Sequence, residues 1–177
     1  MRTADATPPR TDRRRLGEAF AVLGSAASNP DEARRRVGRI ALAAETGPER
    51  AHIARMRAMA GADQWPDRHL LVTALDTETG EQQVFDRASG APLPRAVAAS
   101  TAFPGVCPPI TVNGRRYMDG SLRSATNAAL AAAEAHTVVT IEPDPESIRA
   151  FGPDLNDRTA WEPAYRAGLR QTTDAAD

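Results

Sequence analysis

The sequence predicts an α/β fold in which helices cover a small sheet. Three observations point to it: apolar residues recur at helical spacing in the first third of the chain, short apolar runs bounded by turn residues fill the middle, and helical stretches separate those runs. Strands that alternate with helices in this way form layered α/β structures. A chain of 177 residues is long enough for one domain with its own core.

The first third of the chain predicts helices. Residues 1–11 contain Thr, Ala, Pro and Arg without apolar periodicity, so we expect a disordered leader there and ordered structure from about Asp12. Beyond it the pattern predicts three helices: one from about Leu16, one that follows the N-cap sequence Ser28-Asn29-Pro30-Asp31-Glu32 and stops near Gly47, and one from Pro48 to Gly61.

The middle of the chain predicts two β-hairpins. Residues 70–75 form a nearly continuous apolar run, typical of a buried strand, and residues 82–85 resume as its partner after a turn. Asn113-Gly114 favours a tight hairpin between residues 110–112 and 115–118. The other expected elements are a short helix at 94–99, an alanine-rich helix at 126–135, a strand at 138–141, and a tail that is a loop up to a short helix from Glu162 to about Gln171.

The composition excludes several classes of protein. The net charge is −1, with 22 arginines against 23 acidic residues, so no overall field attracts nucleic acid or an anionic membrane, and any lipid contact must be local. The single cysteine, Cys107, leaves no internal disulfide and fits a reducing cytoplasm. No secretory signal or membrane-spanning stretch is apparent, and the three histidines lack metal-ligand spacing. We therefore expect a cytoplasmic protein without a metal.

Complete catalytic sets are missing from the sequence. No G-x-S-x-G nucleophile elbow occurs, the nearest approach being residues 24–28, and no two glycines are adjacent, so no glycine-rich oxyanion or phosphate loop is visible. The remaining candidate is Asp119, in Tyr117-Met118-Asp119-Gly120, because a carboxylate at a strand end faces the crevice where α/β proteins bind ligands. An Asp-Gly pair by itself is more often a turn.

The residues on both sides of Asp119 supply a resemblance. In order and spacing, the chain is similar to bacterial patatin-like phospholipases over roughly residues 34–143, most strongly from Trp65 onward. The resemblance rests on Trp65-Pro66-Asp67-Arg68, Thr73-Ala74, Thr79-Gly80, Val84-Phe85-Asp86, residues 96–100, Phe103-Pro104-Gly105-Val106, Pro108-Pro109, residues 114–120, and the stretch from Asn127 to Pro143.

The resemblance implies a three-layer α/β/α fold and a serine–aspartate dyad that hydrolyses lipid acyl esters. Asp119 matches the family's aspartate, which would act as the general base, with Gly120 and Asn127 supporting the motif. Ser121 replaces the small Ala or Gly that usually follows. The implied substrate is a lipid or fatty acyl ester, met by peripheral membrane contact, with no cofactor, metal or nucleic acid.

The same resemblance predicts a domain that is incomplete at its N-terminus. In the family the oxyanion loop and the serine elbow precede the region with which this chain begins. We expect a partial patatin-like domain at 12–143, helical over 12–61 and α/β over 65–143, and a separate tail at 144–177. Such a chain would be inactive alone and would self-associate or need a complementing N-terminal half.

Three hypotheses stay open at this point: an inert fragment of a serine hydrolase, a non-catalytic pseudoenzyme or acyl-chain binding module, and a hydrolase with an unrecognised serine. Two interpretations also stay open for several single features. Asn127 either caps or buttresses the following helix or binds substrate, and Cys107 either lines an apolar wall or is reactive. The arginine runs at 13–15 and 34–36 are either solvated helix faces or contacts for lipid headgroups.

Overall fold

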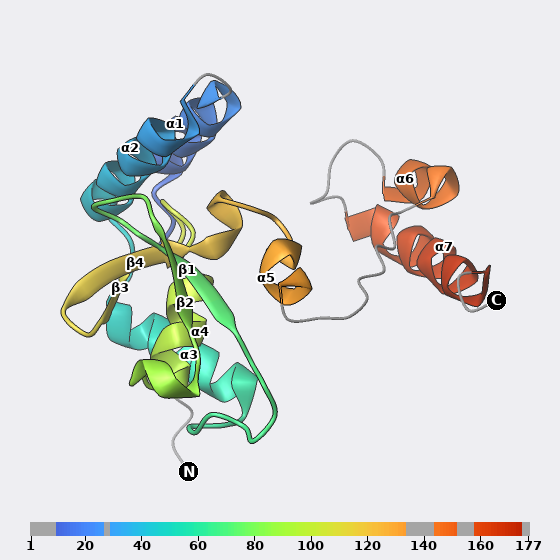
Figure 1. The fold of residues 1–177 in the computed structure, drawn as a ribbon. Helices are drawn as coiled ribbons and strands as arrows, with labels where there is room; N and C mark the ends of the chain where they lie inside the picture. The colour runs from blue at the N-terminus through green and yellow to red at the C-terminus, as the bar shows by residue number, and fades with distance from the viewer. Residues whose placement is uncertain (1–9, 27–28, 134–143, 152–157, 175–177) are drawn as a thin grey trace, which may run out of the picture. The chain divides into compact units, whose positions relative to one another are not determined.

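The computed structural model describes residues 10–26, 29–133, 144–151 and 158–174. The chain forms two compact units, Met1–Ala128 and Ala129–Asp177. The first holds the sheet with its covering helices, and the second is helical (Figure 1). The expected strand at 138–141 lies outside the described residues.

The three helices expected before residue 62 are present. They are α1 (Arg13–Gly24), α2 (Pro30–Ala43) and α3 (Glu49–Ala60). The side chain of Asp12 accepts a hydrogen bond from the Arg15 amide at the start of α1, and that of Asn29 does the same for Glu32 in α2. The N-cap residues of the sequence therefore set these helix starts.

The sheet has four strands in the order β2-β1-β4-β3, and every neighbouring pair is antiparallel. The strands are β1 (Val72–Asp76), β2 (Gln82–Phe85), β3 (Ile110–Val112) and β4 (Arg115–Asp119), so both expected hairpins are confirmed. Asn113 and Gly114 have φ of 48° and 80°, as a tight hairpin turn requires. Between the hairpins lie the 3₁₀ helix η2 (Arg87–Ser89) and α4 (Leu93–Ser100).

Helices cover both faces of this sheet, α1 and α2 on one face and α3 and α4 on the other (Figure 1). Successive residues of a strand point to opposite faces. Leu75 and Met118 accordingly join the core under α1 and α2, whereas Ala74 and Tyr117 join the core with α3 and α4. The predicted α/β class with helical outer layers is therefore confirmed.

One glycine lets α2 approach the sheet closely. A Cβ added to Gly38 would lie 1.9 Å from the carbonyl oxygen of Thr77, in the turn after β1. Because that contact is with backbone, no side-chain rotation could relieve it. Gly38 thus fixes where α2 crosses the sheet.

The second unit contains two helices that pack on each other, α6 (Pro145–Phe151) and α7 (Trp161–Asp174), the latter preceded by η4 (Arg158–Ala160). Ser147 Oγ donates to Gln171 Oε1 at 3.2 Å, and Arg170 pairs with Glu146. The sequence predicted a loop where α6 lies, which is wrong, because Asp144 caps that helix through the Ser147 amide at 2.6 Å. The expected alanine-rich helix is present in part as α5 (Ala128–Ala132).

Within the described ranges, no helix combines the length and apolar character that crossing a membrane requires.

Candidate active site

Asp119 is the last residue of β4, an inner strand of the sheet. Its register partner on β1 is Ala74, and its amide donates to the carbonyl of Ala102 at 3.1 Å. The half-buried carboxylate accepts a hydrogen bond from the Ser121 amide at 2.8 Å through Oδ1. In the described part of the chain, this is the carboxylate's one hydrogen bond, which leaves Oδ2 available to a further donor.

Gly120 has a packing reason to follow Asp119. It begins the 3₁₀ helix η3 (Gly120–Leu122), which lies against β1. A Cβ at this position would lie 2.5 Å from both the carbonyl oxygen and the hydroxyl oxygen of Thr73. The chain can therefore turn directly after Asp119 only where no side chain is present.

Asn127 connects the segment that follows η3 to the edge strand β2. Its Oδ1 accepts from Gln82 Nε2 at 2.6 Å, and its Nδ2 donates to the Ser124 carbonyl at 2.9 Å. Its φ of 51° is a left-handed conformation that Asn tolerates better than most residues. None of these hydrogen bonds reaches Asp119.

A second aspartate, Asp76, ends β1, and both of its carboxylate oxygens accept hydrogen bonds. It is 5% exposed and accepts hydrogen bonds from the amides of Glu78 and Thr79 at 2.9 and 3.0 Å. Arg115 Nε donates to it at 2.6 Å. Burial favours the neutral acid, but the bond from Arg115 and the two amides outweigh it and lower the pKa of Asp76. Sequence reasoning treated this residue as part of a turn and missed its partner on β4.

Two side chains of α3, His52 and Arg55, and the side chain of Thr101 at the C-terminal end of α4 form a cluster of polar groups. His52 is 3% exposed, with Nε2 3.1 Å from both the Ala98 carbonyl and Thr101 Oγ1. Arg55 donates to His52 Nδ1 at 2.8 Å, which places the ring proton on Nε2. Burial and the neighbouring Arg55 both lower the pKa of His52, so the ring is neutral.

Cys107 lies beside the same arginine, which approaches its sulfur at 3.8 Å. Burial raises the pKa of the Cys107 thiol, Arg55 opposes that rise, and the charge of Asp119 adds to it. The thiol is therefore protonated and a poor nucleophile.

Glu49 and Arg95 close the outer edge of β3. Glu49 accepts from the Thr111 amide at 2.8 Å and from its hydroxyl at 3.1 Å, while Arg95 donates to the Thr111 carbonyl at 2.8 Å. Both outward backbone groups of Thr111 are thus satisfied by side chains. A separation of 62 residues between Glu49 and Thr111 hid this pair from local sequence patterns.

No cluster of metal-ligating side chains occurs within the described ranges. What the fold and the site define is an α/β protein with a strand-end carboxylate beside a glycine turn. The chain belongs to the patatin-like phospholipase family, because the model of that family matches residues 9–132. Comparisons with curated proteins and with solved structures gave no match.

The family match confirms the resemblance found in the sequence and extends it toward the N-terminus. We expected it to span roughly residues 34–143, whereas the family model already covers α1 and ends at residue 132. At the level of the family, the function is that of a lipid acyl hydrolase.

Proposed function

We propose that Asp119 is the general base of a serine–aspartate lipid acyl hydrolase to which this chain contributes the aspartate. The observation that carries the proposal is the contrast in hydrogen bonding: Asp119 keeps an oxygen free of donors among the described residues, whereas both carboxylate oxygens of Asp76 accept hydrogen bonds. A half-buried carboxylate with a free lone pair can accept a proton from a serine hydroxyl.

In the proposed reaction, the serine oxygen attacks the ester carbonyl while its proton passes to Asp119. The alcohol then leaves with that proton, and an acyl-enzyme remains. Water, deprotonated by the same carboxylate, releases the fatty acid and restores the serine. The family supports a lipid or fatty acyl ester as the substrate, and the single cysteine supports a cytoplasmic location.

The nucleophile is proposed to come from outside these 177 residues, because they contain no G-x-S-x-G sequence. On this proposal the chain alone neither hydrolyses esters nor reacts with a fluorophosphonate probe. Gly120 allows the tight turn after Asp119, and Asn127 accepts a hydrogen bond from Gln82 that connects the following segment to β2. Both are positioning residues.

The test has two stages. The purified chain is treated with a fluorophosphonate and with a short-chain ester, and labelling at any serine would contradict an external nucleophile. The coding sequence upstream of Met1 is then read, and if it encodes a serine elbow in frame, the extended protein is assayed with Asp119→Asn and Asp76→Asn variants. Without such an elbow, the acyl-chain binding module becomes the better reading.

A further inference from the structure

The buried side chain of His52 joins the first turn of α3 to the last turn of α4. Its Nε2–H group donates at 3.1 Å to the carbonyl of Ala98 and to the hydroxyl oxygen of Thr101, and its Nδ1 accepts from Arg55 at 2.8 Å. Because both ring nitrogens have partners, the orientation of the ring is fixed. The reaction proposed at Asp119 does not use this side chain.

The bond from His52 to Ala98 lies at the C-terminal end of α4, a helix of eight residues. The last carbonyls of an α-helix have no amide partner further along the helix and take their donors from elsewhere. The carbonyl of Ala98 accepts from the Thr101 amide at 3.3 Å, and the imidazole supplies a shorter contact, at 3.1 Å. His52 therefore stabilises the last turn of α4 from a neighbouring helix.

The chain directly after α4 holds the backbone of Asp119. β3 begins at Ile110, which pairs with Tyr117, so Asp119 lies two residues beyond the last pairing between β3 and β4. Its amide donates instead to the carbonyl of Ala102 at 3.1 Å. Ala102 is fully buried, and its own amide donates to the carbonyl of Ala99 at 3.2 Å, in the turn that ends α4. The position of Asp119 therefore depends on how firmly the end of α4 is held.

We propose that His52 is a positioning residue for Asp119 and acts through the end of α4 and the carbonyl of Ala102. The proposal rests on the function proposed above, in which Asp119 is the general base. When the bond from His52 to Ala98 is lost, the last turn of α4 loosens, and the acceptor of the Asp119 amide moves with it. The carboxylate of Asp119 accepts one hydrogen bond among the described residues, so little else restrains it.

A positioning role and a space-filling role make different demands on residue 52. Filling the space between α3 and α4 requires only volume, which Phe supplies. Positioning requires an N–H donor directed at the carbonyl of Ala98, which Gln supplies and Phe does not. His52→Phe and His52→Gln therefore separate the two roles.

The experiment measures amide hydrogen exchange by NMR in the full chain, with the wild type and both variants of His52. The exchange rate of the Asp119 amide is divided by the mean rate of the β1 amides. β1 pairs with a strand on each side, so its amides report opening of the whole sheet. The ratio therefore isolates local opening at Asp119 from a general loss of stability.

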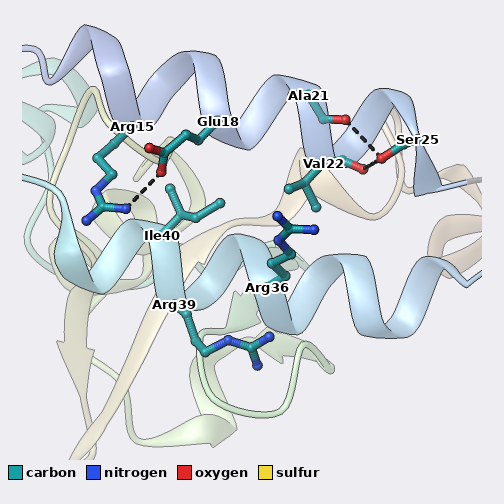
Figure 2. A pocket seen from close by; sticks show the side chains of 8 residues that line it. All are labelled: Arg15, Glu18, Ala21, Val22, Ser25, Arg36, Arg39 and Ile40. Carbon is teal, nitrogen blue, oxygen red and sulfur yellow. Dashed lines mark hydrogen bonds and ion pairs between the residues drawn. The ribbon is translucent and has the colours of Figure 1, made fainter.

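Two further variants complete the set. The matched control is Ile40→Ala, which leaves a cavity on the other face of the sheet, where Figure 2 shows Ile40 on α2 pointing toward α1. Thr101→Val removes the second acceptor of the imidazole at an exposed position, so the core stays intact. If His52→Phe does not fold, Thr101→Val compared with Ile40→Ala decides the question.

We expect His52→Phe to raise the ratio about tenfold, the effect of losing one hydrogen bond to a buried group, and His52→Gln to stay within about twofold of the wild type. Thr101→Val should raise the ratio less, about threefold, because Ala98 keeps its bond to His52. In Ile40→Ala, Asp119 and β1 should exchange faster by the same factor. An unchanged ratio in both His52→Phe and Thr101→Val, or equal increases in His52→Phe and His52→Gln, would overturn the proposal.

Failure of the proposed function would give a different result. If Asp119→Asn kept its turnover in the extended protein, Asp119 would not be the base and His52 would have no role in catalysis, whatever the exchange ratios. If Asp119 is the base, His52→Phe in that protein should lower kcat about tenfold and leave KM within about twofold, because a displaced base slows the chemical step rather than binding. His52→Gln should restore kcat, and a loss of kcat equal to that of His52→Phe would contradict positioning through the N–H donor.

Discussion

The turns that follow β1 and β4 begin in the same way, with an aspartate at the end of an inner strand, yet they use that residue differently. Asp76 accepts from two amides and from Arg115, and it is almost completely buried. Asp119 is half-buried and accepts from one amide in the described part of the chain. Because β1 and β4 are antiparallel, the two turns lie at opposite ends of the sheet.

The difference between the two turns separates a structural carboxylate from a candidate base. A carboxylate that already accepts several hydrogen bonds is stabilised as the anion and takes up a proton reluctantly. Asp76, bonded to Arg115 across the sheet, ties β1 to β4. Asp119 has one carboxylate oxygen without a donor among the described residues. We therefore propose the site at that end of the sheet.

Turnover should show the largest difference between the two aspartates. In the extended protein with its nucleophile, Asp119→Asn should lower kcat by a factor of about 10³–10⁴, because the amide cannot accept the serine proton. Asp76→Asn should lower kcat far less wherever the protein remains folded. Equal losses in the two variants, measured at a temperature where both are folded, would refute the assignment of Asp119.

For stability we expect the opposite order, with the larger effect at Asp76. Asp76→Asn removes the charge that receives Arg115 and disturbs two amide bonds, and we expect a loss of about 2–4 kcal/mol in the free energy of unfolding. Asp119→Asn should cost less than about 1 kcal/mol, since a single hydrogen bond is affected. Urea denaturation followed by circular dichroism measures both values, and a larger loss for Asp119→Asn would contradict the contrast.

A third change tests why the turn at Asp119 needs a glycine. Gly120→Ala places a methyl group against the backbone of Thr73, and we expect a loss of about 1–3 kcal/mol in stability. The matched control is Gly114→Ala, whose added Cβ has open space but whose φ is 80°, so it reports strain without a clash. If the two substitutions cost the same amount, close packing on β1 is not what requires glycine at position 120.

Local signals in the sequence predicted much of this fold but few of its polar contacts. The caps at Asp12 and Asn29 and the Asn113-Gly114 turn act within a few residues, so they could be read directly. Asp119 was found as a strand end through its motif. The hydrogen bonds that Thr111 donates to Glu49 and Arg115 donates to Asp76 join residues 62 and 39 positions apart, and only the folded sheet brings them together.

The missed helix α6 shows a different reason for failure. The Pro and Asp content of the tail beyond Glu142 suggested a loop, although an aspartate cap followed by proline at the first helical position, as at Asp144 and Pro145, is also a helix start. The apolar periodicity after it is short, so the local pattern did not decide between the two. Packing of α6 on α7 supplies what the segment itself lacks.

The pH dependence of stability gives the finest test of the two turns. The pKa of Asp76 is lowered in the folded state, so its contribution is complete above its unfolded pKa, about 3.9, and is lost as the pH falls through the lower folded value. The pKa of His52 is also lowered, so the folded state resists its protonation and stability declines as the pH falls below about 6.5, the unfolded value for histidine.

The two pH ranges are distinct, and the free energy of unfolding measured from pH 7.5 to 3 should show two declines. Asp76→Asn should make the decline at lower pH smaller without removing it, because the pKa values of Asp12, Glu18, Glu32 and Asp144 are lowered as well, and His52→Gln should remove the decline at higher pH. Asp119→Asn should leave the His52 decline unchanged, because no hydrogen bond joins Asp119 to His52. If the decline at lower pH were smaller in Asp119→Asn and unchanged in Asp76→Asn, Asp119 would be the structural carboxylate, and the assignment of the two aspartates would be wrong.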